Sequence, residues 1–294
     1  KRKLFESLDA IVIDEISMVR ADLLDCIDGM LRLYGPSYNK PFGGVQMIFF
    51  GDLFQLPPVV NRMEQDIFKG HYLSPYFFSA KAFGQLDLHI LELNKIYRQK
   101  DEYFIHLLNA LRHNELKDNH LESFNTRLYH KVSFNKGDFY ITLTTTNALA
   151  EDVNNRCLRE LPGEQFTYKG EVSGDFEKKS LPGQEDLYLK VGAQVMMLNN
   201  DTDKRWVNGS LGIVEAIRAN SGVEDIILVR LENGQMVDVK RYTWEIYQYY
   251  FDEVANNLAS KVIGYFTQYP LKPAWAVTIH KSQGQTFERV MIDV

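Results

Sequence analysis

Asp14 and Glu15 follow a short apolar run, residues 8–13, and are the first neighbouring side chains in the sequence that could do chemistry. An acid at the end of a strand can hold Mg²⁺ through water, and a second acid beside it can activate a water for attack on a phosphate. Acids at strand ends are also common as solvated turn residues or helix caps, and Ser17 or Asp22 could be caps here. The two acids alone leave both interpretations open.

A second polar group follows the next apolar run, in the segment GDLFQLPPV at residues 51–59. The chain leaves the run through Gly51 and Asp52, and it places the amide of Gln55 four residues beyond that run. Pro57 and Pro58 then stiffen the loop, because proline fixes φ and removes a backbone donor. A rigid loop that carries an amide beside carboxylates could sense a bound phosphate. An ordinary proline-rich turn is the alternative.

The segment TIHKSQGQT near the end of the chain supplies donors instead of acids. Thr278, His280, Lys281 and Ser282 offer hydroxyl, imidazole and ammonium groups within five residues, and such groups bind phosphates without reading a base sequence. Gly284 would let the backbone approach a ligand closely. The alternative is a polar loop that leads into a capped helix.

Parallel strands are expected to position these groups. Residues 8–13 form a continuous apolar run, which predicts a parallel strand covered on both faces, and residues 45–52 are typical of a second strand. Residues 20–33 carry apolar side chains at helical spacing. This order of strand, helix and strand predicts an α/β parallel sheet, in which ligands bind at the carboxyl ends of the strands. Later in the chain we expect a helix at 101–113, a strand at 139–147 and a helix at 148–161.

The pattern changes in the second half of the chain. Residues 162–186 are predicted to be loop or short strands, and residues 209–270 contain short alternating strands separated by turns, typical of a small antiparallel barrel. Buried parallel-strand patterns return at residues 274–279 and 287–294.

Composition sets limits on the class of protein. The chain has 294 residues, 45% hydrophobic and 24% charged, as in a soluble globular protein, and it has no apolar run long enough for a membrane helix. Its two cysteines are far apart, which makes a disulfide framework or a zinc site improbable. The net charge of -6 argues weakly against a broad nucleic-acid-binding face but leaves room for a local basic groove.

Taken in order, these segments resemble the PIF family of DNA helicases, within the superfamily 1 enzymes that include the RecD-like proteins. DEIS at 14–17 is similar to that family's motif II, residues 18–32 to its signature sequence, and GDLFQLPPV to its motif III. The resemblance continues through the motif IV region and the entry to an inserted barrel, and it ends in motif V. The corresponding residues are 93–112, 143–155, 191–214 and 274–294.

The resemblance implies a fold and a division into domains. The expected fold class is α/β, with RecA-like parallel-sheet domains, the first of them incomplete, and an inserted small antiparallel β-barrel of the Src-homology-three type. Residues 1–92 would be part of the first domain, 93–208 the first part of the second, 209–270 the barrel and 271–294 the return segment.

The resemblance also implies roles for individual residues. Asp14 would hold Mg²⁺, Glu15 would be the general base, Gln55 would sense the γ-phosphate, and Arg98 would reach it as an arginine finger. Gly284 and Glu288 would lie at the nucleotide side of motif V. Single-stranded DNA would be held by Thr146, Asn147, Pro57, Pro58, Thr278, His280, Lys281 and Ser282.

Two elements of the family pattern are missing from these residues. A Walker A loop, GxxxxGK[ST], cradles phosphates with its backbone N–H groups, and the sequence contains no Gly-Lys dipeptide. The family's last motif, motif VI, is also not matched before Val294. We therefore expect an internal fragment of an ATP- and Mg²⁺-dependent 5′-to-3′ DNA helicase that does not hydrolyse ATP by itself.

The resemblance carries expectations about partners as well. The protein would act on single-stranded and on forked or structured DNA as a monomer, without a membrane. It would work in a bacterial-type cytoplasm, or in the nucleus or mitochondrion of a eukaryote. Two other functions remain open: a nucleic-acid or protein-binding module with vestigial acids, and a carboxylate-dependent hydrolase of small molecules.

Overall fold

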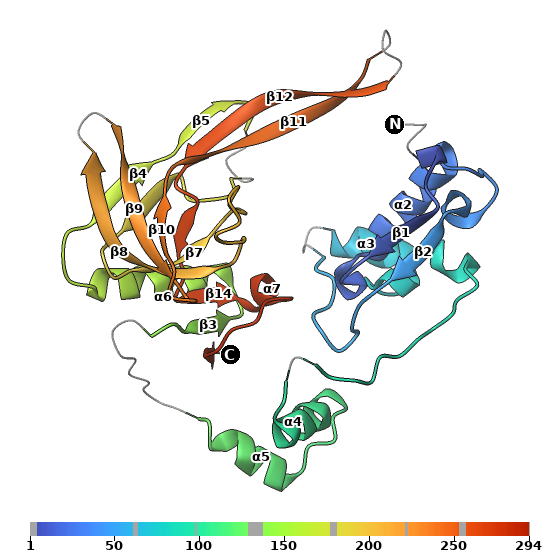
Figure 1. Ribbon diagram of the computed structural model, residues 1–294. Coiled ribbons are helices and arrows are strands. Elements are labelled where there is room, and N and C mark those ends of the chain that lie inside the picture. The colour runs from blue at the N-terminus through green and yellow to red at the C-terminus, as the bar shows by residue number, and fades with distance from the viewer. Residues whose placement is uncertain are drawn as a thin grey trace. The chain divides into compact units, whose positions relative to one another are not determined.

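The computed structural model describes residues 5–60, 64–97, 99–128, 138–176, 181–220, 223–252 and 257–293. The chain divides into two compact units, Lys1–Val132 and Ser133–Val294. Each unit is treated by itself below (Figure 1).

Unit 1 is built on two parallel strands, β1 (Ala10–Ile13) and β2 (Gln46–Phe49), which pair Ile13 with Phe49. Helix α2 (Ala21–Tyr34) connects them and buries Ala21, Leu24 and Leu31 in a core shared with Phe42. The remaining elements of this part are η1 (Ile16–Met18), η2 (Pro41–Gly44), α3 (Gln65–His71), η3 (Phe77–Ser79) and η4 (Phe83–Gln85).

The expectation that the first strand is covered on both faces was wrong for this unit. Exposure alternates along β1, and the side chain of Val12 is 59% exposed while Ile11 and Ile13 are half-buried. The reason is that, in the described residues, β1 pairs with β2 alone and the core of α2 packs against one face of that pair.

Two helices follow an extended segment in unit 1. Helix α4 (Glu102–Arg112) begins at Asp101, whose carboxylate accepts the backbone N–H of Phe104 at 3.0 Å, and α5 (Asp118–Asn125) follows it. Both helices fall in the first unit because the division comes after Val132. The domain boundary at residues 92 and 93 stays a prediction.

Unit 2 contains a parallel sheet of three strands in the order β14 (Ala276–Thr278), β3 (Ile141–Thr144) and β15 (Val290–Asp293). Helix α6 (Asn147–Glu160) follows β3, and the short helix α7 (Ile279–Ser282) follows β14. The strands and helices expected from residues 139–161 and 274–294 are therefore present, and β3 lies at the centre of the sheet.

The antiparallel part of unit 2 is larger than the segment 209–270. A five-stranded sheet runs in the order β10-β9-β8-β7-β13, a second sheet in the order β11-β12-β5, and β4 pairs with β6. Their bounds are β4 (Phe166–Lys169), β5 (Glu171–Gly174), β6 (Asp186–Leu189), β7 (Gln194–Met197), β8 (Leu211–Asn220), β9 (Val223–Leu231), β10 (Met236–Val239), β11 (Tyr242–Asp252), β12 (Asn257–Gln268) and β13 (Leu271–Pro273). Among the described strands the five-stranded sheet is open, with β10 and β13 at its edges.

Two details of this region differ from the sequence prediction. The alternating pattern of residues 235–247 predicts one short strand, but pairing with β9 ends at Val239 and pairing with β12 begins at Tyr242. The resulting hairpin of β11 and β12 is long, with 11 and 12 residues, and it extends from the rest of unit 2 in Figure 1. No helix in the described residues is long and apolar enough to cross a membrane.

Candidate functional site

The two acids of unit 1 lie at the carboxyl end of β1, as predicted. The loops after the two strands are joined, because the backbone N–H of Ile16 donates to the carbonyl of Phe50 at 2.9 Å. Asp14 is exposed, and its Oδ1 accepts the backbone N–H of Glu15 at 2.8 Å. Glu15 is half-buried and has a left-handed backbone, with φ 52° and ψ 41°. This conformation is uncommon for a residue with a side chain, and it turns the chain sharply after the strand.

Close packing holds that turn in place. A Cβ atom at Gly51 would lie 2.8 Å from Cγ2 of Ile16, and 3.1 and 3.2 Å from the backbone nitrogens of Ile16 and Ser17. The hydroxyl of Ser17 is buried and has no hydrogen-bond partner in the described part of the chain. The loop after β2 can therefore pass over the acidic turn only because residue 51 has no side chain.

Neither Ser17 nor Asp22 caps the helix that follows. Helix α2 begins after Arg20 without a side-chain cap, and Asp22 lies in its first turn. The guanidinium of Arg20 reaches Asp22 at 2.6 Å and Glu64 at 2.7 Å. Its hydrogen bonds to Asp22 hold the pKa of that carboxyl below its usual range.

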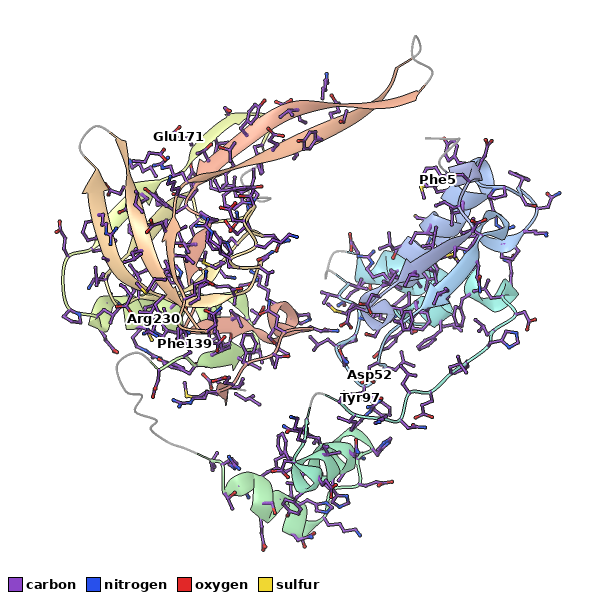
Figure 2. The ribbon with its side chains drawn as sticks, viewed as in Figure 1. Phe5, Asp52, Tyr97, Phe139, Glu171 and Arg230 are labelled. Atoms are coloured by element: carbon purple, nitrogen blue, oxygen red, sulfur yellow. The ribbon has the colours of Figure 1, made fainter. Side chains whose placement is uncertain are left out.

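The loop after β2 is organised around Asp52 (Figure 2). One carboxylate oxygen accepts the backbone N–H of Phe54 at 3.0 Å, and the other lies 3.5 Å from the amide nitrogen of Gln55. Gln55 is exposed, Pro57 is exposed and Pro58 is buried. The predicted amide sensor thus lies within reach of a carboxylate at the neighbouring strand end.

Sequence reasoning missed the contact that ties this loop to α4. Arg112, the last residue of α4, donates to Asp52 at 3.1 Å, and its guanidinium lies 4.6 Å from the ring centre of Phe54. The next residue, His113, meets the same ring edge-on at 5.3 Å. The sequence pattern marks 101–113 only as an amphipathic helix. Arg98, the predicted arginine finger, lies outside the described residues.

In unit 2, threonines stand where the adjacent strands β3 and β14 end. Thr146 is exposed and caps α6, its hydroxyl oxygen accepting the backbone N–H of Leu149 at 3.2 Å. Asn147 is exposed in the first position of that helix. Thr278 is buried and caps α7 by accepting the N–H of Lys281 at 3.4 Å. The sheet therefore brings the predicted DNA-contacting groups of residues 146–147 and 278–282 to one edge.

Two amides brace the opposite ends of these strands, where β3 and β14 begin, and neither was predicted. Asn154 of α6 accepts the backbone N–H groups of Trp275 and Ala276, both at 2.8 Å, and donates to the carbonyl of Ala276 at 2.9 Å. Gln194 of β7 donates to the carbonyls of Tyr140 and Ala274, at 2.6 and 2.7 Å. Asn154 was inside a segment singled out for its threonine and asparagine, but no local pattern indicated which backbone it would bind.

Helix α7, which follows β14, presents two exposed nitrogen-bearing side chains, His280 and Lys281. Ser282 donates its hydroxyl proton to the carbonyl of Ile279 at 2.8 Å, so in this conformation that proton is not offered to a ligand. Gly284 has φ of +76°, which favours glycine, in agreement with the expected close backbone approach. Glu288 is exposed, and together with burial it raises the pKa of Glu232.

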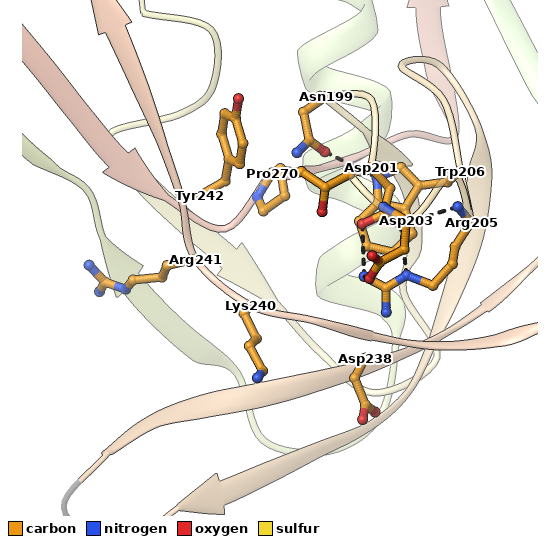
Figure 3. A pocket seen from close by; sticks show the side chains of 11 residues that line it. Asn199, Asp201, Asp203, Arg205, Trp206, Asp238, Lys240, Arg241, Tyr242 and Pro270 are labelled. Carbon is orange, nitrogen blue, oxygen red and sulfur yellow. Dashed lines mark hydrogen bonds and ion pairs between the residues drawn. The ribbon is translucent and has the colours of Figure 1, made fainter.

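A cavity of about 410 Å³ in unit 2 contains none of the predicted site residues (Figure 3). Arg205 lines it, bound to Asp201 at 2.7 Å and stacked 4.6 Å over the ring of Trp206. Arg205 is thus already paired, as is Arg241, which also lines the cavity and lies 3.0 Å from Glu171. Trp206 is a buried core residue. In the described residues no group of three or more His, Cys, Asp and Glu side chains could hold a metal ion.

Comparisons with known proteins identify relatives over the whole chain. Residues 1–121 match the PIF1-like helicase family model. A human protein named ATP-dependent DNA helicase PIF1 is 34% identical over 292 residues, which cover 97% of this chain and 42% of that protein. A Campylobacter jejuni protein named ATP-dependent DNA helicase Pif1 is 30% identical over 307 residues, covering 100% of this chain and 65% of the relative.

Solved structures agree. The Bacteroides Pif1 helicase in complex with ADP-AlF3 and ssDNA superposes with a TM-score of 0.72 at 41% identity, over 100% of this chain and 66% of that one. The Candida albicans Pif1 helicase gives a TM-score of 0.79 at 29% identity, over 99% and 68%. The chain thus spans about two fifths to two thirds of the length of these relatives. The structural matches also confirm the expected RecA-like parallel-sheet domains. On the strength of this family match and of the relatives in sequence and structure, the chain belongs to the PIF1-like helicase family.

Proposed function

We propose that this chain is part of an ATP-dependent helicase that moves 5′-to-3′ on single-stranded DNA and unwinds forked or structured duplexes. The observation that carries the proposal is the pair of loops after β1 and β2, in which Asp14, Glu15, Asp52 and Gln55 gather at one edge of a parallel sheet. A relative of 41% identity was solved in complex with ADP-AlF3 and ssDNA, and this supports a nucleotide and single-stranded DNA as ligands in the proposal.

The acids suit a magnesium nucleotide. Asp14 is exposed and oriented through one oxygen by the N–H of Glu15, and within the described part of the chain its second oxygen has no partner. That oxygen is available for Mg²⁺, a cation that prefers carboxylates and water. Magnesium, when bound, would neutralise charge on the phosphates of ATP. The Glu15 carboxylate would accept a proton from the attacking water, and the Gln55 amide would sense the γ-phosphate, with Arg98 as the finger.

The donors of unit 2 suit a nucleic-acid backbone. Thr146, Asn147, Thr278, His280 and Lys281 lie on loops that follow adjacent parallel strands, and Ser282 closes the second loop. These groups bind phosphates and sugars without regard to base sequence, as a translocating enzyme requires. Pro57 and Pro58 would form a rigid edge against the same strand of DNA.

The phosphate cradle is a separate question. The 294 residues contain no GxxxxGK[ST] segment. The acids present could hold the magnesium ion of a nucleotide, but no segment present would cradle the triphosphate. We therefore propose that this chain alone does not hydrolyse ATP, and that Gly284 and Glu288 contact nucleotide only in the longer protein.

Further parts of the proposal concern architecture and setting. The antiparallel sheets around residues 209–270 would form a Src-homology-three type barrel inserted into the second RecA-like domain. Residues 1–92 would be the incomplete first domain, and 93–208 with 271–294 the second. The protein would work as a monomer, in a bacterial-type cytoplasm or in a eukaryotic nucleus or mitochondrion.

The test is ATP hydrolysis by the chain extended upstream and downstream to the length of its relatives, with and without single-stranded DNA. We expect DNA to raise the rate, and Glu15→Gln to lower it by about 10²- to 10⁴-fold because the general base is lost. Glu122→Gln, an exposed change of the same kind on α5, should leave the rate unaltered. A DNA-dependent rate that persists in Glu15→Gln would contradict the assignment.

A non-enzymatic module that binds single-stranded DNA is the second candidate, favoured by the absence of a GxxxxGK[ST] segment from these residues. It would be supported if the extended protein bound single-stranded DNA tightly but hydrolysed no ATP in its presence.

A further inference from the structure

Lys272 has an unusual position for a lysine. It is the middle residue of β13, between the buried Leu271 and Pro273, and it pairs with Met196 of β7. Directly paired residues of antiparallel strands project on the same face, and Met196 is buried in the core that also contains Leu211 and Val277. The aliphatic part of Lys272 therefore covers the edge of this core, and its ammonium projects beyond it.

The second unusual feature of Lys272 is that its ammonium lacks an anion among the described residues. No hydrogen bond or ion pair joins it to any group in the described part of the chain, although its side chain is half-buried. Burial, and then the positive charge of Lys281, lower the pKa of Lys272 to about 8. Its neighbours Met196, Leu271 and Pro273 are uncharged, so the charged group that acts on it is a second cation. Leaving a cation partly desolvated and unpaired is unfavourable unless a ligand supplies the anion.

The backbone links Lys272 to the loop already proposed for DNA. From β13 the chain runs through Ala274 and Trp275 into β14, and from β14 directly into α7, which carries Lys281. Gln194 fixes the carbonyl of Ala274 and Asn154 fixes Trp275. The two lysines are therefore carried by one braced segment. The turn at Gly209 also joins its two ends, because the Gly209 N–H donates to the carbonyl of Met197, the partner of Leu271, and a Cβ at Gly209 would lie 2.6 Å from the amide nitrogen of Gln285. Lys272 therefore lies beside the segment that follows Lys281.

We propose that Lys272 is a further phosphate-binding residue, which together with Lys281 holds the backbone of single-stranded DNA. This inference rests on the proposed function, because it places the phosphate at the loop of residues 278–282. A phosphodiester fits better than a carboxylate side chain of the protein, since it can lie between two cations and no ion pair joins either lysine to an acid of the described residues.

The first test compares the affinity of the 294-residue chain for a fluorescently labelled deoxyadenylate oligomer at several salt concentrations. One phosphate contact contributes about 0.7 to the slope of log K against log salt, so Lys272→Met should lower affinity roughly fivefold at about 0.1 M salt and make the slope shallower by about 0.7. Lys240→Met is the matched control, because Lys240 is exposed, has no hydrogen-bond or ion-pair partner in the described part of the chain and lies on the turn before β11.

The second test measures how the affinity for the oligomer depends on pH. A phosphate favours the charged form of Lys272, so its pKa rises on binding and the complex takes up a proton above pH 8. Affinity of the wild-type chain should be full below this pH and fall between about pH 8 and pH 9. The Lys272→Arg variant should keep its affinity for the oligomer over this pH range, because arginine stays charged throughout it.

The outcomes separate the two proposals. If the wild-type chain does not bind the oligomer, the proposed DNA-binding function fails and this inference fails with it. If the wild-type chain binds and Lys272→Met matches Lys240→Met in affinity and salt slope, only the role of Lys272 is overturned. Loss of affinity in Lys272→Met with a pH profile identical in wild type and Lys272→Arg would also overturn it, since that pattern indicates altered packing.

Discussion

The strand ends of unit 1 and unit 2 solve the same positioning problem in different ways. After β1 and β2 the backbone itself is shaped: Glu15 is left-handed, and Gly51 lies against Ile16 with no room for a side chain. After β3 and β14 the backbone is ordinary, and the hydroxyls of Thr146 and Thr278 hold it by capping the helices that follow. The amides of Asn154 and Gln194 brace the backbone where these two strands begin. Acids are thus held by close packing of main chain, and phosphate donors by side-chain hydrogen bonds.

This contrast matters for the proposed chemistry. A carboxylate that holds a metal ion or takes a proton must be placed to within a fraction of an ångström, and main-chain packing gives little freedom. A loop that grips successive phosphates must release them again, and a hydrogen-bonded brace can yield more easily than a steric contact. The two regions are therefore expected to respond differently to substitution.

The largest effect is expected at the brace of unit 2. Asn154→Ala leaves the N–H groups of Trp275 and Ala276 and the carbonyl of Ala276 without their partner, and should destabilise unit 2 by about 3 kcal/mol. Asn155→Ala, one residue on and exposed, should cost little. Trp206, Trp244 and Trp275 are the three tryptophans of the chain, and all belong to unit 2, so urea denaturation followed by tryptophan fluorescence reports on that unit.

If Asn154→Ala and Asn155→Ala unfold at the same urea concentration, the contrast between the two units is contradicted, because unit 2 would then not depend on its side-chain brace. The Asn154→Asp variant tests the separate hydrogen bonds of this brace. The aspartate can still accept the two N–H groups, but it cannot donate to the carbonyl of Ala276, so an intermediate loss is expected.

The next effect is expected at the steric contact of unit 1. Gly51→Ala forces a Cβ against Ile16 and should destabilise unit 1 by about 2 kcal/mol, as overpacking does. Gly29→Ala in α2 is the control, because nothing lies within 4 Å of its Cβ and alanine favours a helix. Far-UV circular dichroism should show the early loss of unit 1 while tryptophan fluorescence stays unchanged. A Gly51→Ala chain as stable as Gly29→Ala would show that the acidic turn can move aside.

How much of this could be predicted from the sequence depends on the range of each interaction. The acids, the amide of Gln55 and the donors of TIHKSQGQT belong to short contiguous segments, and those segments were placed correctly at strand ends. The brace of Asn154 joins residues 122 positions apart in sequence, and the contact of Arg112 with Asp52 spans 60. Neither has a local pattern, because tertiary packing decides which backbone group an amide or a guanidinium meets.

The errors have the same origin. The apolar run before Asp14 predicted a strand buried on both faces, but burial depends on what packs against it, and Val12 is exposed. Ser17 and Asp22 were plausible caps by type and position, yet Arg20 engages Asp22 and the fold buries Ser17. The long hairpin of β11 and β12 was read as short strands because alternation alone does not reveal where pairing partners change.

The smallest effect concerns Thr146, where capping and DNA binding can be separated. Its hydroxyl oxygen accepts the N–H of Leu149, which leaves the hydroxyl proton for a phosphate. Thr146→Ala should lose both functions and destabilise unit 2 by about 1 kcal/mol, the usual cost of a lost cap. Thr146→Asp should keep the cap, since a carboxylate accepts the same N–H and suits a helix N-terminus, but should repel the DNA backbone. Fluorescence denaturation and oligomer binding would therefore rank these two variants in opposite orders. If both measurements rank them alike, Thr146 acts on DNA only through the stability of α6, and unit 2 would hold phosphates with the cations of the loop after β14.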